Sequence, residues 1–129
     1  MIVSSRGRYA LRICLALSQN WREYQSVNSV CTKEGISQKY AESLISALVK
    51  AGVCEGTRGK CGGYRLTRPP EEITAAEVIA ATEPSLAAVG CLKEPCPRAE
   101  RCKTLPFWRA LDETVNEFLS RYSLGDLMR

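Results

Sequence analysis

The strongest constraint on the fold is a pair of short amphipathic segments separated by a tight turn at Gly35. The first segment, about residues 27–34, spaces its apolar side chains at helical intervals and ends at this glycine, which favours a left-handed helix stop. Ser37 is then a good N-cap for a second helix over about residues 38–51. Two short helices joined by a tight turn that contains glycine form a helix-turn-helix motif.

A β-hairpin is predicted directly after this motif. Residues 53–55 and 64–66 are strand-like runs on either side of a turn with three glycines, and Pro69-Pro70 ends the unit. A further helix over residues 5–19, with apolar side chains at helical spacing, precedes the motif. The sequence therefore predicts a winged helix-turn-helix domain over residues 1–70.

The second half of the chain is organised differently. Thr74 to Glu77 has the form of a capping box, which predicts a helix over residues 75–82. Residues 85–105 have no periodicity, and a last helix is predicted over residues 107–122. This helix carries an apolar stripe: Trp108, Leu111, Val115, Phe118, Leu119 and Tyr122. We expect residues 71–129 to hold a cysteine loop and a long C-terminal helix, whose stripe is too apolar for a helix that stands alone. The predicted fold class is mainly α with a small β-hairpin wing.

Composition excludes several functional classes. The chain of 129 residues has no histidine, which removes the usual general base, and it is not expected to be an enzyme. No apolar stretch approaches the roughly 18 residues of a membrane span, so a cytoplasmic location without a membrane partner is expected. Seven cysteines, an odd number, then favour free thiols or metal ligands over a disulfide framework.

Charge and helix position single out a candidate surface for double-stranded DNA. Residues 1–70 hold 11 Lys and Arg against 4 Asp and Glu, whereas residues 71–129 hold 7 against 10. A basic half suits a polyanion, and the second helix of the motif can enter the major groove. Its candidate contacts are Ser37, Gln38, Lys39, Glu42 and Ser43, and the candidate wing contacts are Arg58 and Lys60. The alternative is a helical domain with a merely solvated basic face.

Three cysteines form the candidate metal site. Cys91, Cys96 and Cys102 lie within twelve residues, on a stretch stiffened by prolines, and three thiolates can converge on one soft metal centre. Their spacing fits neither a redox CxxC pair nor the paired knuckles of common zinc sites, whereas iron–sulfur ligation is a good chemical match. The alternative is three unrelated free thiols on a loop.

Five motifs together resemble the Rrf2 family of bacterial transcription regulators, over essentially the whole chain. They are Ser5-x-Gly7-Arg8-Tyr9-Ala10-Leu11-Arg12, Gly35-Ile36-Ser37-Gln38-Lys39-Tyr40-x-Glu42, Leu48-x-Lys50-Ala51-Gly52-Val53, Arg58-Gly59-x-x-Gly62-Gly63-Tyr64-Arg65-Leu66 and Pro69-Pro70-Glu71-Glu72-Ile73-Thr74. The resemblance implies a homodimer of winged helix-turn-helix domains, with the long C-terminal helix crossing between protomers. It also implies that Cys91, Cys96 and Cys102 hold an iron–sulfur cluster whose state alters operator binding.

The chain departs from the family at the fourth cluster ligand. In IscR-like members this ligand is a histidine, at a position occupied here by Leu105, and in NsrR-like members it is an aspartate, at a position occupied here by Arg8. A glutamate, an aspartate, another cysteine or an external ligand could replace them. Three thiolates suffice for three irons of a [4Fe-4S] cluster, which is therefore slightly favoured, whereas a [2Fe-2S] cluster needs four ligands and stays open if an outside ligand completes it.

Two other functions remain alternatives to the cluster-dependent regulator. The first is the same DNA-binding scaffold without a cluster, sensing thiol oxidation, another metal or a small effector. The second is a thiol redox or cluster-carrier protein that does not bind DNA. The lack of both a CxxC pair and a histidine to activate a thiol speaks against this second alternative.

Overall fold

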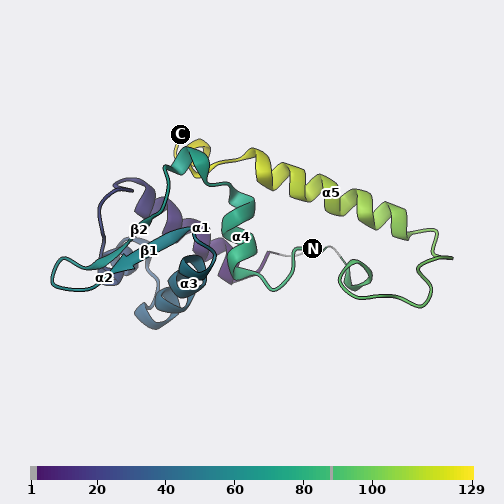
Figure 1. Ribbon diagram of the computed structural model, residues 1–129, viewed down its shortest axis with the longest axis horizontal. Coiled ribbons are helices and arrows are strands. Elements are labelled where there is room, and N and C mark those ends of the chain that lie inside the picture. The colour runs from purple at the N-terminus through teal and green to yellow at the C-terminus, as the bar shows by residue number, and fades with distance from the viewer. Residues whose placement is uncertain (1–2, 88) are drawn as a thin grey trace.

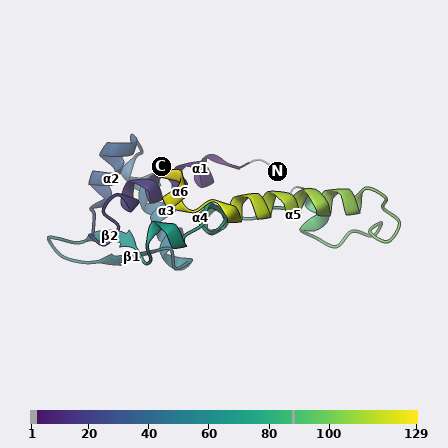
Figure 2. The same cartoon turned by 90° about the horizontal axis from the view of Figure 1, so that it is seen from above.

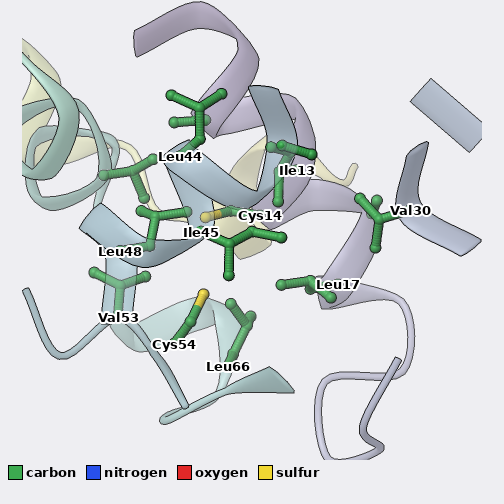
Figure 3. Packing of buried hydrophobic residues seen from close by; sticks show 14 of the residues in the cluster. Ile13, Cys14, Leu17, Val30, Leu44, Ile45, Leu48, Val53, Cys54 and Leu66 are labelled. Carbon is green, nitrogen blue, oxygen red and sulfur yellow. The ribbon is translucent and has the colours of Figure 1, made fainter. Parts of the chain in front are cut away.

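Helix α1 (Ser5–Ser18) lies in the middle of the fold, which a computed structural model describes for residues 3–87 and 89–129. Its inward face contributes side chains that are fully shielded from solvent, among them Ala10, Ile13, Cys14 and Leu17. Three further helices pack around it: α2 (Val27–Glu34), α3 (Gln38–Lys50) and α4 (Ala75–Thr82) (Figure 1). The side chains between them form one apolar core (Figure 3).

The predicted helix-turn-helix is present, and its ends have the predicted caps. Gly35 ends α2 with a φ of 64°, and its backbone N–H donates to the Cys31 carbonyl. The Ser37 hydroxyl then accepts from the Tyr40 backbone N–H at the start of α3. The capping box between Thr74 and Glu77 at the start of α4 is also confirmed.

The wing is an antiparallel hairpin of β1 (Cys54–Thr57) and β2 (Gly63–Leu66), which confirms the predicted fold class. The hairpin is anchored at its base by Gln25, because Gln25 and Tyr64 exchange backbone hydrogen bonds of 2.9 and 2.8 Å. Gly63 permits this contact, since a Cβ at that position would lie 2.2 Å from the Gln25 carbonyl oxygen. The second strand is thus held between β1 and the α1–α2 connection.

The chain returns to the core after its last long helix. A 3₁₀ turn, η1 (Pro70–Glu72), leads into α4, and a short helix that the sequence does not predict, α6 (Leu124–Leu127), packs against η1 and α1. Leu124 is fully buried, and its backbone N–H donates to the Ile73 carbonyl at 2.8 Å. Residues on both sides of position 70 therefore contribute to one continuous core. The division into a DNA-binding domain (residues 1–70) and a second part (residues 71–129) stays a prediction.

Helix α5 (Leu105–Arg121) extends away from this core (Figures 1 and 2). It begins two residues before the predicted start, because Pro106 is accommodated in its first turn, and only its first residue, Leu105, is buried. Residues 83–104, here called the cysteine segment, precede it, and their described residues (83–87 and 89–104) contain one short 3₁₀ turn, η2 (Gly90–Leu92). Within residues 3–87 and 89–129, no helix combines the length and apolarity needed to cross a membrane.

The core predicts a contrast between two adjacent residues of α3. Leu48 is fully buried and Val49 is 38% exposed. Leu48→Ala leaves a cavity in the core and should lower the free energy of unfolding by about 2–5 kcal/mol. Val49→Ala, the matched control, should change it by no more than about 0.5 kcal/mol. Urea denaturation of both variants measures the difference, and equal effects would contradict the assignment of the core face of α3.

Candidate nucleic-acid interface and cysteine segment

The outward face of α3 carries the residues predicted to read DNA. Gln38, Lys39, Glu42 and Ser43 are all exposed. The Gln38 amide donates to the Glu42 carboxylate at 3.2 Å, so these two side chains already lie together on the helix surface. Ser37 is also exposed, but its hydroxyl is engaged in capping the helix. This row is polar because the opposite face of α3 supplies Leu44, Ile45 and Leu48 to the core.

The wing tip presents Arg58 and Lys60 to solvent, on a turn closed by glycines. The Gly62 N–H donates to the Gly59 carbonyl at 3.0 Å, and a Cβ on Gly62 would lie 2.7 Å from the Thr57 carbonyl oxygen. Only glycine fits this turn without a shift of the backbone. The two cations are therefore displayed on a turn whose path is set by its glycines.

Charge pairing distinguishes two kinds of cation in the basic half. Three arginines are paired with glutamates: Arg12 with Glu34 at 3.0 Å, Arg65 with Glu55 at 2.8 Å and Arg68 with Glu77 at 2.8 Å. By contrast, in the part of the chain that the structure describes, no ion pair forms at Lys39, Arg58 or Lys60. Lys39 lies on α3, and Arg58 and Lys60 lie on the wing, where a phosphate backbone could pair with them.

The N-terminus of α1 also borders this surface, a neighbour that the sequence does not predict. The Ser5 and Tyr40 hydroxyls are 3.3 Å apart, and the Arg6 guanidinium donates to the Ser43 hydroxyl at 3.5 Å. Arg8 is exposed in the same first turn of α1. The sequence signal was a pair of arginines at the start of a helix, but only the packing of α1 on α3 brings Arg6 beside Ser43, one of the predicted DNA contacts.

The three cysteines of the cysteine segment are free thiols. Cys91 is exposed on η2, whereas Cys96 and Cys102 are half-buried. Among residues 3–87 and 89–129, no three cysteine, aspartate or glutamate side chains are close enough to hold a metal ion. The donor chemistry fits a thiophilic metal centre, but the structure does not bring the three thiols together.

Cys102 has the most distinctive environment of these thiols. Its sulfur lies 3.2 Å from the Thr104 hydroxyl. Hydrogen bonds from that hydroxyl, and from the backbone N–H groups of Thr104 and Leu105, lower the pKa of the Cys102 thiol. Cys102 also lines a surface pocket together with Arg98 and Arg101. A partly exposed thiol with a lowered pKa has the features of a reactive cysteine.

Of the four remaining cysteines, three are buried and one is exposed. Cys14 and Cys54 are buried in the core (Figure 3), and a hydrogen bond with Cys54, together with burial, raises the pKa of Cys14. Burial also raises the pKa of Cys31, with Glu42 adding to the shift. Cys61 is exposed at the wing tip. Cys14 and Cys31 are core residues.

Comparison with known proteins decides the family. Residues 3–129 match the Rrf2 family, described as iron-dependent transcriptional regulators. The chain belongs to the Rrf2 family. It is accordingly a DNA-binding transcription regulator rather than an enzyme, which confirms the prediction from its motifs.

Relatives within the Rrf2 family match this chain along nearly its whole length. It is 39% identical over 130 residues to the HTH-type transcriptional regulator IscR of Aliivibrio salmonicida, covering 99% of this chain and 77% of that protein. It is 36% identical over 132 residues to the protein rrf2 of Nitratidesulfovibrio vulgaris, covering 100% of this chain and 88% of the relative.

Solved structures of Rrf2 proteins have the same fold. CymR, the global cysteine regulator of B. subtilis, superposes with a TM-score of 0.80 at 32% identity, covering 99% of this chain and 96% of that one. IscR of T. potens superposes with a TM-score of 0.74 at 28% identity, covering 99% and 86% of the two chains. The two similar structures are thus named for different regulators built on one scaffold.

The surroundings of Cys102 predict selective alkylation. Because its pKa is lowered by Thr104, Thr104→Val should raise the pH at which iodoacetamide alkylation of Cys102 reaches half its maximal rate. Mass spectrometry of peptides sampled across a pH series gives that rate for each cysteine. Thr114→Val, on the exposed face of α5, serves as the control and should leave the Cys102 profile unchanged. An unaltered profile in Thr104→Val would contradict the proposed activation.

Proposed function

We propose that this Rrf2 protein binds an operator in double-stranded DNA, in the cytoplasm, through α3 and the wing, and that the cysteine segment regulates this binding. The observation that carries the proposal is the exposed polar row of α3 followed directly along the chain by the unpaired cations of the wing. A helix in the major groove and a basic wing on the neighbouring backbone use these two features together.

Each predicted contact residue has a distinct chemical role in this proposal. Gln38 can bind adenine through two hydrogen bonds, and Glu42 can accept from cytosine N4, so these two read sequence. In the free protein they bond to each other, and base contacts replace that bond on binding. Ser37 and Ser43 offer hydroxyls to bases or phosphates, whereas Lys39 supplies charge to the backbone. Arg58 and Lys60 of the wing reach phosphates or the minor groove.

The same proposal assigns Cys91, Cys96 and Cys102 to an iron–sulfur cluster. Three free thiols on a segment with little secondary structure can rearrange around a cluster, and thiolates are the ligands that such clusters require. When bound, a cluster supplies a redox-active iron centre that oxidants can alter or remove. The fourth ligand is a carboxylate, a further cysteine or an external molecule, since the chain has no histidine.

A second mode of sensing on the same scaffold is direct thiol oxidation. The lowered pKa of Cys102 and its partial exposure favour it. Among solved structures, an oxidised form of Staphylococcus aureus CymR has a TM-score of 0.75 and is 28% identical to this chain. In this mode the thiolate of Cys102 reacts with an oxidant, and no metal is involved.

We propose that α5 joins two copies of the chain into a homodimer. Its apolar stripe remains largely uncovered: Leu111 is 38%, Phe118 is 50% and Tyr122 is 43% exposed. An open apolar groove of about 390 Å³ lies where α5 meets α1, α4 and α6, with Leu11 and Ile79 in its wall. Such a stripe beside an apolar groove suits a second copy of α5, because pairing the two buries both.

The wing assignment predicts a loss of operator affinity in Arg58→Ala. Arg58 is exposed on the wing turn, so its removal should weaken binding and reduce the salt slope by about one, while stability changes by no more than about 0.5 kcal/mol. Fluorescence anisotropy, on DNA that the protein has selected from a random library, measures the affinity and its salt dependence. Arg129→Ala removes the same charge at the C-terminus and should have little effect. Equal affinities for the two variants would sink the wing assignment.

The cluster assignment predicts a specific set of cysteine effects. Cys91→Ala, Cys96→Ala and Cys102→Ala should each abolish anaerobic iron and sulfide incorporation, measured chemically and by visible absorbance. Cys31→Ala should retain it, because Cys31 is buried on α2. Cys14→Ala should likewise retain it, because Cys14 is fully buried in the core. Full cluster loading in any of the three segment variants would falsify the assignment.

The dimer assignment predicts that a charge on the apolar stripe blocks association. Val115→Glu would bury an unpaired carboxylate between two chains, at a cost of several kcal/mol. Analytical ultracentrifugation at micromolar concentration should then find monomer or aggregate. Thr114→Glu, one residue away on the exposed face, should sediment as the dimer. A well-behaved dimer of Val115→Glu would exclude this stripe as the interface.

A further inference from the structure

The carboxylate of Glu83 lies at the N-terminus of α1, although 79 residues separate it from Ser4. Its Oε1 atom accepts hydrogen bonds from the Ser4 backbone N–H at 2.9 Å and from the Ser4 hydroxyl at 2.6 Å. The Ser4 side chain does not cap its own helix, and the first turn of α1 has no acidic residue. Since a helix N-terminus favours negative charge, Glu83 supplies what the local sequence lacks.

Gly7 makes room for this contact. A Cβ at Gly7 would lie 2.7 Å from the Glu83 carboxylate oxygen and 2.9 Å from the Val3 side chain. Gly7 is nonetheless inside a helix, where alanine would be favoured by propensity. The glycine is therefore explained by the approach of Glu83 rather than by the helix itself.

The two residues after Ser4 contact α3. The Ser5 hydroxyl lies 3.3 Å from the Tyr40 hydroxyl, and the Arg6 guanidinium donates to the Ser43 hydroxyl at 3.5 Å. Arg6 also donates to the Thr82 carbonyl, next to Glu83, at 3.4 Å. The individual bonds are long, but three consecutive residues, 4–6, connect Glu83 on one side with α3 on the other.

Glu83 is also the first residue of the cysteine segment. It follows α4 directly, and Pro84 after it restricts its backbone, so the segment leaves the core in a defined direction. We propose that Glu83 is a positioning residue that links the cysteine segment to operator binding, because it holds residues 4–6 against Tyr40 and Ser43 of α3. A change in the cysteine segment that displaces Glu83 then alters how α3 presents its DNA contacts.

This inference rests on the proposed role of α3 in operator binding, but its test does not need a cluster. Cys61→Ser, which removes the exposed wing thiol, serves as the background. Iodoacetamide then alkylates Cys91, Cys96 and Cys102, as checked by mass spectrometry, while the other three cysteines are buried. Two quantities are measured before and after: the affinity for selected operator DNA, and hydrogen exchange in the first turn of α1.

In the background protein, alkylation should change operator affinity at least fivefold and accelerate exchange over residues 4–9. In Glu83→Ala both responses should fall, the affinity ratio to within about twofold. Gly7→Ala tests the same contact from the other side and favours the helix by propensity, so its loss of response would not be a folding defect. Glu23→Ala, an exposed glutamate on the α1–α2 connection, should keep the full response.

The outcomes separate this link from the proposed function. A full response in both Glu83→Ala and Gly7→Ala, or no response in the background protein, would overturn the link. If the protein fails to incorporate iron and sulfide but still responds to alkylation through Glu83, only the cluster proposal is contradicted. If Arg58→Ala and Lys39→Ala leave operator affinity unchanged, the DNA surface is wrong, and hydrogen exchange still tests the contact between Glu83 and α1.

Discussion

Burial of one face of α1 is the interaction on which the rest of the structure depends. Ala10, Ile13, Cys14 and Leu17 are fully buried, and they contact a core to which α2, α3, α4, α6 and the wing hairpin all contribute. A buried aliphatic side chain stabilises a fold by about 1.5–3 kcal/mol, so these few residues supply a large part of the stability of a small domain. Because α1 contacts α2, α3, α4, α6 and β2, its position also sets the direction in which α3 faces solvent.

The polar surface follows from that packing. Once Leu44, Ile45 and Leu48 of α3 face α1, the remaining side chains of α3 must face outward, and these are the ones suited to bases and phosphates. Exposed ion pairs such as Arg12 with Glu34 add little stability. They compensate three arginines of the basic half, whereas Lys39, Arg58 and Lys60 are among the cations of that half that form no ion pair in the residues the structure describes.

The parts outside the core are those to which regulation is assigned. The described residues of the cysteine segment hold one short 3₁₀ turn, and α5 buries only Leu105 in a single chain, so neither is held by extensive apolar contacts. Segments with few buried contacts change conformation at low free-energy cost. Glu83, the first residue of the cysteine segment, is the position through which we propose that such a change reaches α1 and α3.

Local patterns in the sequence determined most of the elements, since helix periods, caps and turn glycines act over a few residues. Gly35, Ser37 and the Thr74–Glu77 box ended or began helices as predicted, and the family motifs then identified the fold. Helix α6 was missed because four residues show no period, although Ser123 and Asp126 form a capping box there.

Tertiary structure alone decided the relations between distant residues. The contact of Glu83 with Ser4, the pairing of Gln25 with Tyr64 and the meeting of Cys14 with Cys54 all join residues 39 or more positions apart. No local preference encodes such contacts, because they arise when apolar faces are buried together. The sequence by itself determined which residues could cap, turn, pair with DNA or bind a metal. Packing around α1 decided which of them lie side by side.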